Sequence, residues 1–193
     1  MAEIPWTWLA IRASGVTAWG LLTAVVVWGI LLRTRILSRL TTGARLLDMH
    51  RWLGATALAF LLVHLSLLLV DPAVRFTPAQ LLIPGLAPWN TVAVTLGILA
   101  FWLLVPVSII GRLRLGRGRG SSRAWRTWFT RSHLIAYAAW PLATAHYVLA
   151  GTDALAQWSL ALLTAGGVVI VMALLARGFV PAPAPTRSAG ATP

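Results

Sequence analysis

The sequence predicts an all-α integral membrane protein with five transmembrane helices arranged as a bundle. Of its 193 residues, 59% are hydrophobic and 10% are charged, whereas a soluble domain carries about 25% charged residues. The apolar residues gather in several runs, each long enough for a helix to cross a hydrocarbon core of about 30 Å. The segments between these runs alternate sharply in arginine content, which is the pattern that the positive-inside rule produces.

The five predicted spans cover residues 15–32, 49–70, 91–110, 132–150 and 155–176. They divide the chain into an outer N-terminal segment, 1–14, a transmembrane domain, 15–177, and a Pro/Ala-rich cytoplasmic tail, 178–193, predicted to be disordered. The first span does not read as a signal peptide, because Glu3 stands where a basic residue belongs and the apolar run ends in Arg33. Segment 71–90 is apolar but contains Pro84 and Pro88, so we expect an interfacial lid over the bundle.

Basic residues cluster in every second connection. The segments after the first, third and fifth spans hold most of the arginines, while the opposite side holds only Arg12 and Arg75 with three of the acids. The positive-inside rule therefore places the N-terminus outside and the C-terminus in the cytoplasm of a multi-pass cell-membrane protein. The net charge of +12 follows from this bias, and we expect no nucleic-acid partner.

Composition excludes several kinds of chemistry. The chain has no cysteine, which excludes disulfides, iron–sulfur clusters, thiolate zinc sites and cysteine nucleophiles. It has no lysine, which excludes Schiff-base cofactors. Its four acids are too scattered for a carboxylate-bridged di-iron site. Ser132 has no acid to complete a triad, and we expect no catalytic residue of this kind.

The four histidines form the main functional pattern. His50 and His64 lie in the second span, and His133 and His146 lie in the fourth. An ionisable residue within a span carries an insertion penalty unless it has a partner, so it marks a functional site by default. Separations of 14 and 13 residues correspond to about 21 Å and 19.5 Å along a helix. Because both spans start on the cytoplasmic side, we expect His50 beside His133 and His64 beside His146.

Paired neutral imidazoles from facing helices suit the two axial positions of a b-type haem. A single zinc or copper ion fits less well, since the two levels are far apart and two histidines rarely complete a coordination shell. The helical phase is the weak point. Fourteen residues return to within about 40° of the starting face, but thirteen miss it by about 140°. Either Pro141 kinks the helix and re-aims one ligand, or the two haems are rotated relative to each other.

The spacing His50-x13-His64 and His133-x12-His146 resembles the ferric reductase-like transmembrane domain. That family includes ferric reductases, NADPH oxidases and the haem-binding membrane subunit of a bacterial methionine sulfoxide reductase system. The resemblance covers about residues 15–177, with weaker likeness at Trp125-Arg126 and at Gly151-Thr152-Asp153. It implies two haems b per chain, held by His50 with His133 at the inner level and by His64 with His146 at the outer level, and electron transfer across the membrane.

Unlike the oxidases, this sequence has no flavin or nicotinamide domain after its membrane part. Gly116-Arg-Gly118-Arg-Gly120 follows a membrane helix rather than a strand, so we interpret it as a basic loop. The chain is then an oxidoreductase membrane component that needs a separate cytoplasmic donor, resembling a flavin reductase, or quinol. The acceptor outside the cytoplasm would be ferric iron, oxygen or an oxidised protein.

Other residues and other functions remain open at this stage. Arg51 and Arg131 lie next to the predicted inner haem ligands and are candidates for binding its propionates, although setting the topology is reason enough for any single arginine. A second reading makes the chain a haem subunit that feeds an extracytoplasmic reductase from quinol or flavin. A third, of another class, is a non-redox helical transporter or assembly factor in which the histidines pack.

Overall fold

The computed structural model describes residues 6–34, 36–39, 41–116 and 122–179. Within these ranges the chain is mostly helical and contains no strand. The elements are α1 (Trp6–Thr34), η1 (Ile36–Arg39), α2 (Gly43–Val70), α3 (Pro78–Leu82), α4 (Thr91–Gly116), α5 (Arg123–Leu134), α6 (Ala136–Ala150) and α7 (Gln157–Phe179). The predicted all-α fold is confirmed. The predicted tail beyond residue 179 and residues 117–120 of the predicted basic loop lie outside the described residues.

Four helices are long and apolar enough to cross a membrane: α1, α2, Thr91–Arg112 within α4, and α7. These helices suit a lipid bilayer and make a multi-pass membrane protein the fitting description. The fourth predicted span, 132–150, is not one helix, because the chain breaks at Ile135 between α5 and α6. The first helix begins at Trp6 and so takes in most of the predicted outer segment, 1–14.

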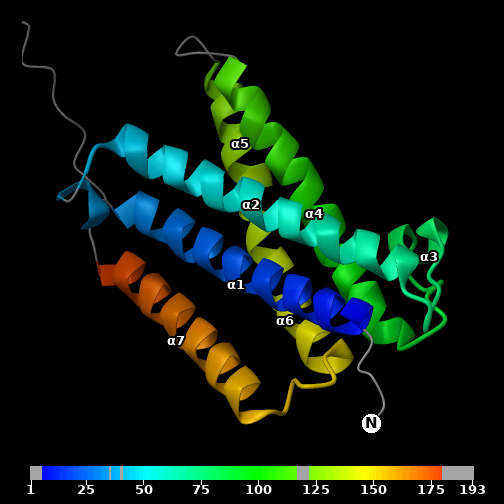
Figure 1. Cartoon of the computed structure of the whole chain (residues 1–193). Helices are drawn as coiled ribbons and strands as arrows, with labels where there is room; N and C mark the ends of the chain where they lie inside the picture. Colours follow the sequence, from blue (N-terminus) through cyan, green and yellow to red (C-terminus); the bar gives the residue numbers. More distant parts are fainter. Residues whose placement is uncertain (1–5, 35, 40, 117–121, 180–193) are drawn as a thin grey trace, which may run out of the picture.

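The helices pack as two antiparallel hairpins with α7 at one side. α1 packs on α2 and α4 packs on α6, and α1 also contacts both α6 and α7. Figure 1 shows α1 lying between α2 and α7, with α4 crossing behind α2 and α6 passing behind α1. Leu22, Val26 and Ile30 of α1 form a buried cluster with Ile170 and Ala173 of α7. This contact attaches α7 to the outside of the first hairpin.

A reciprocal pair of hydrogen bonds joins α1 to α6. The indole Nε1 of Trp19 donates to Thr144 Oγ1 at 2.9 Å, and the indole Nε1 of Trp140 donates to Thr23 Oγ1 at 2.9 Å. Each threonine hydroxyl in turn donates to the carbonyl of the tryptophan four residues before it in its own helix. The two W-x3-T segments thus satisfy their polar groups without water, as an apolar environment demands.

Segment 71–90 packs against the C-terminal end of α2 and the N-terminal end of α4 (Figure 1). Its buried residues Phe76, Leu81 and Ala87 cluster with Val94 and Ile98 of α4. Thr77 caps the short helix α3 in a capping box with Gln80, and the indole of Trp102 donates to the Leu82 carbonyl at 2.8 Å. The segment is thus folded against α4 and the end of α2, and its role as an interfacial lid stays a prediction.

Candidate functional site

The four histidines meet in two pairs. The ring centroids of His50 and His133 are 6.0 Å apart with an interplanar angle of 66°. Those of His64 and His146 are 6.4 Å apart with an angle of 78°. The predicted pairing is therefore the one that the structure contains, and α2 runs in the same direction as α5 and α6. Along α2 the two levels are about 21 Å apart at the rise of an α-helix.

A tight turn at Ile135 contributes to bringing His133 into the same cavity as His146. The Ile135 amide donates to the Ser132 carbonyl at 3.2 Å, and the Ala138 amide donates to the Ile135 carbonyl at 3.0 Å. Such i to i−3 bonds wind the chain at about 120° per residue instead of 100°. Three or four residues at this pitch add about 60–80°, which is about half of the 140° that separates the face of His133 from that of His146 in a regular helix.

The position of this break differs from the expected one. Pro141 was the expected cause of any kink, but it lies inside α6. The break lies at Ile135, which is both the C-cap residue of α5 and the N-cap residue of α6. No proline or glycine marks residue 135, so no local sequence signal identifies it.

The outer imidazoles are held by backbone carbonyls of the neighbouring helices. His64 Nδ1 lies 2.9 Å from the Ile11 carbonyl oxygen of α1, and His146 Nδ1 lies 2.7 Å from the Ala93 carbonyl oxygen of α4. A carbonyl only accepts, so each Nδ1 carries the hydrogen and donates it. The Nε2 of each neutral ring then keeps the lone pair that a metal ion binds.

Glycines make this close approach possible. A Cβ atom at Gly97 would lie 2.9 Å from His146 Nδ1, and one at Gly15 would lie 3.0 Å from His64 Cε1. At the inner level, a Cβ at Gly29 would lie 3.3 Å from His50 Cε1. The sequence reading did not single out these glycines. Gly15 and Gly29 are 14 residues apart in the sequence, the same spacing as His50 and His64, and that shared spacing was the signal available.

The inner pair is held differently. The backbone of Val25, four residues before Gly29, interacts with His50, but this contact is too loose to count as a well-formed hydrogen bond to the buried Nδ1 of His50. The ring of His133 stacks on the buried ring of Phe129 at a centroid distance of 5.4 Å and an interplanar angle of 15°. Ring stacking therefore orients His133, whereas carbonyl hydrogen bonds orient the outer histidines.

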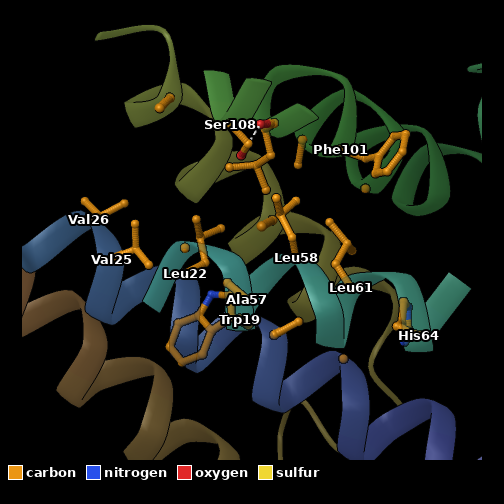
Figure 2. Close-up of a pocket in the computed structure, with 18 of the residues that line it drawn as sticks. Trp19, Leu22, Val25, Val26, Ala57, Leu58, Leu61, His64, Phe101 and Ser108 are labelled. Carbon is orange, nitrogen blue, oxygen red and sulfur yellow. Dashed lines mark hydrogen bonds between the residues drawn. The ribbon is translucent and has the colours of Figure 1, made fainter. Parts of the chain in front are cut away.

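One continuous cavity contains all four histidines. Its volume is about 1890 Å³, roughly twice the upper end of the usual range for a pocket that holds one small ligand, about 300–1,000 Å³. Figure 2 shows its apolar middle, where Leu58 and Leu61 of α2 point toward α4, which carries Phe101. Trp19, Leu22, Val25 and Val26 of α1 line the same stretch.

Charged side chains line the two ends of the cavity. The end beside His50 is lined by Arg33, Arg51 and Arg112, from α1, α2 and α4. The end beside His64 is lined by Arg12, Asp71 and Asp153. Arg12 forms an ion pair with Asp153, and its guanidinium carbon lies 4.0 Å from the centroid of a Trp8 ring. The middle of the cavity is thus apolar, and its two ends, called mouths below, are polar.

The two arginines that were predicted to bind propionates differ in their position relative to the cavity. Arg51 lines the cavity, although its guanidinium also pairs with Asp48 at 2.8 Å. Arg131 is exposed and is not among the residues that line the cavity. Arg33 and Arg112, which sequence reasoning treated only as topology signals, stand at the same mouth as Arg51. The role of each arginine remains a prediction.

The geometry of the pairs fits bis-imidazole ligation of a single metal. A metal–imidazole bond is about 2.0–2.1 Å, and a five-membered ring with bonds of about 1.33 Å has a radius of about 1.1 Å. Two imidazoles on opposite sides of one metal then hold their centroids about 6.2–6.4 Å apart. The outer pair, at 6.4 Å, matches this separation, and the inner pair, at 6.0 Å, is slightly closer.

The donor set favours a metal that brings its own equatorial ligands. Within the described ranges, no group of three or more histidine, aspartate or glutamate side chains gathers to hold a metal ion. Two histidines alone rarely complete the shell of a bare zinc or copper ion. A haem supplies four nitrogen ligands itself and needs only axial ligands from the protein. The paired histidines therefore fit a haem.

No protein-family model, no curated protein and no solved structure matches this chain.

Proposed function

We propose that this protein is a di-haem b membrane protein of the ferric reductase-like type, which transfers electrons from a cytoplasmic donor to an acceptor outside the cytoplasm. The observation that carries the proposal is the pairing of all four histidines at two levels of one cavity, with ring separations of 6.0 and 6.4 Å. His50 and His133 would hold the inner haem, and His64 and His146 the outer one. A bound haem supplies one-electron redox chemistry through its iron.

The protein's own residues then have three tasks. The imidazoles present neutral nitrogen ligands at two depths, and helix carbonyls fix the ring orientation at the outer level. The leucines, valines and Trp19 in the middle of the cavity exclude water between the levels, which keeps the environment of both sites apolar. The arginines at the inner mouth suit carboxylate groups such as propionates. Together these features support two fixed redox centres across an insulating layer.

The lengths of α5 and α6 and the positions of their histidines support counting the two helices together as a fifth crossing. α6 has 15 residues, which is short for a span of about 20 residues. His133, the last-turn histidine of α5, and His146 of α6 pair with residues at both depths of α2. We therefore propose that the α5–α6 segment extends through the same depth as α2, and that the N-terminus faces out, as the arginine distribution predicts.

The donor is proposed to be a separate cytoplasmic protein or quinol. Arg33, Arg51 and Arg112 at the inner mouth complement an acidic protein surface, and such charge complementarity raises association rates. Electron delivery by an acidic protein would slow as salt is added, because added ions screen exposed charges. Delivery by quinol would show little dependence on salt.

The proposal is tested with the purified full-length protein in detergent. We expect oxidised and dithionite-reduced absorption spectra of a six-coordinate b-type haem, with about two haems per chain. Ser66→Ala is the matched control for histidine variants in α2, because the Ser66 hydroxyl is exposed and bonds only the Leu62 carbonyl of its own helix. A preparation supplied with haem during expression that shows no b-type spectrum would refute the proposal and leave a non-redox membrane protein as the better description.

A further inference from the structure

The two hairpins repeat one set of contacts around the outer histidines. In each hairpin a carbonyl of the first helix accepts from a histidine of the second, across 53 residues in both cases. In each, a glycine four residues after that carbonyl faces the same imidazole. The repeated set pairs Ile11 with Ala93, Gly15 with Gly97, and His64 with His146, and the second member of every pair lies 82 residues after the first.

The 82-residue offset does not extend to the inner histidines. Gly111 lies 82 residues after Gly29, but His133 lies 83 residues after His50. A Cβ at Gly29 would meet the His50 ring at 3.3 Å, whereas one at Gly111 would meet nothing within 4 Å. The extra residue coincides with the tight turn at Ile135. Val25, Gly29 and His50 bring the same kinds of group together at the inner level, but the short carbonyl hydrogen bonds are those of the two outer histidines.

We infer that Gly15 and Gly97 are positioning residues that set the tautomer and orientation of the outer histidines. Each glycine admits an imidazole onto the carbonyl four residues before it, so that Nδ1–H is donated to that carbonyl and Nε2 remains free to bind a ligand. The part that concerns haem ligation rests on the proposed function. The part that concerns the tautomer of His64 and His146 does not.

Helix geometry explains why glycine is required at these positions. The carbonyl of residue i accepts the amide of residue i+4 and still has a second lone pair for the histidine. The Cα–Cβ bond of residue i+4 leans toward the helix N-terminus, and so toward that carbonyl. A methyl group at Gly97 would lie 2.9 Å from the atom that makes the 2.7 Å hydrogen bond. The ring must then move, and the hydrogen bond is lost.

The first test is the ¹⁵N spectrum of the full-length, haem-free protein labelled in its histidines. His64→Ala and His146→Ala assign the two outer rings. We expect both outer rings in the Nδ1–H tautomer in the unsubstituted protein. An Nε2–H tautomer at either ring would overturn the inference, and this measurement needs no glycine variant to fold.

The second test compares Gly15→Ala and Gly97→Ala with Gly20→Ala. Gly20 is in α1, does not line the cavity, and a Cβ there meets nothing within 4 Å. Gly97→Ala should shift the His146 signal and leave that of His64 unchanged, while Gly15→Ala should do the reverse. The unaffected ring is an internal control for folding. If His146 has the same tautomer in the Gly97→Ala variant as in the Gly20→Ala variant, the inference is wrong.

The third test uses the haem-loaded protein and separates this inference from the proposed function. Gly97→Ala should lower the bound haem from about two per chain to about one, or change the electron paramagnetic resonance signal of one haem only. Gly20→Ala should leave both unchanged. If the unsubstituted protein binds no haem, the proposed function fails while the tautomer spectra still decide the inference. If it binds two haems and Gly97→Ala alters neither, the inference fails alone.

Discussion

His146 Nδ1 lies 2.7 Å from the carbonyl oxygen of Ala93, and this contact ties the second histidine helix to its neighbour α4. The corresponding contact of His64 with Ile11, at 2.9 Å, ties α2 to α1. Both imidazoles are therefore held by the backbone of a helix that contains no histidine of its own. Backbone carbonyls move little, so this arrangement keeps the ring planes in place whether or not a metal ion is bound.

Replacing single histidines should act on one level at a time. We expect His64→Ala to lower bound haem from about two per chain to about one and to leave the spectrum of the inner site, because the levels are about 21 Å apart. His50→Ala should remove the other haem. Haem content and low-temperature absorption spectra measure the effect. Equal loss of both haems in His64→Ala would contradict two independent sites.

Phe129→Leu should alter the inner site alone. Phe129 is buried and stacks on His133 at 5.4 Å, and leucine retains an apolar side chain but removes the flat surface that orients the ring. We expect a changed paramagnetic resonance signal and a shifted midpoint potential for the inner haem, with the outer haem unaffected. Phe101→Leu, in the middle of the cavity, is the control. Identical signals in Phe129→Leu and the unsubstituted protein would show that stacking does not orient His133.

Arg51→Gln and Arg131→Gln should differ. Arg51 lines the cavity and Arg131 does not, so only the first removes a cation from the inner mouth. A charge-assisted hydrogen bond contributes about 1.5–3 kcal/mol, which corresponds to about a tenfold or greater weakening of inner-haem retention if Arg51 binds a propionate. Haem dissociation to an apoprotein scavenger provides the measurement. A larger effect of Arg131→Gln would favour the sequence-based pairing of Arg131 with the inner haem.

The reciprocal tryptophan–threonine bonds should contribute to helix association. Thr23→Val and Thr144→Val each remove the acceptor of one indole N–H at 2.9 Å. We expect a loss of about 0.6–2 kcal/mol of stability for each, the range measured for hydrogen bonds between membrane helices. Unfolding in mixed detergent, followed by tryptophan fluorescence, reports the change. Thr56→Val, whose hydroxyl bonds only its own helix, should have a smaller effect.

Two adjacent glycines of α7 provide a test of packing. A Cβ at Gly166 would lie 2.7 Å from Trp19 Cη2, whereas one at Gly167 would meet nothing within 4 Å. We expect Gly166→Ala to destabilise the protein by about 1–3 kcal/mol because it overpacks the contact with α1. Gly167→Ala should be neutral or stabilise by up to about 1 kcal/mol through helix propensity. Thermal unfolding of the two variants side by side distinguishes them, and equal midpoints would contradict close α1–α7 packing at Gly166.

Hydropathy and charge predicted much of the fold because they depend on local composition. Runs such as 49–70 are apolar enough to be recognised in isolation, and α2 covers that run. The fourth span was less accurate. Residues 132–150 are apolar as a block, but the helix breaks at Ile135, where two i to i−3 bonds replace the regular pattern. Composition does not record such a change in winding.

The sequence by itself determined which histidines belong together. Two parallel spans with near-equal spacing bring His50 to His133 and His64 to His146, since depth in a helix depends only on residue number and rise. How the rings are held, and which of Arg51 and Arg131 lines the cavity, became known from the packing of the helices. The Ile11 and Ala93 carbonyls, the close approach of Gly15 and Gly97, and the stacking of Phe129 on His133 all depend on which faces of neighbouring helices meet. That choice is made by packing between residues far apart in the chain, and no local pattern encodes it.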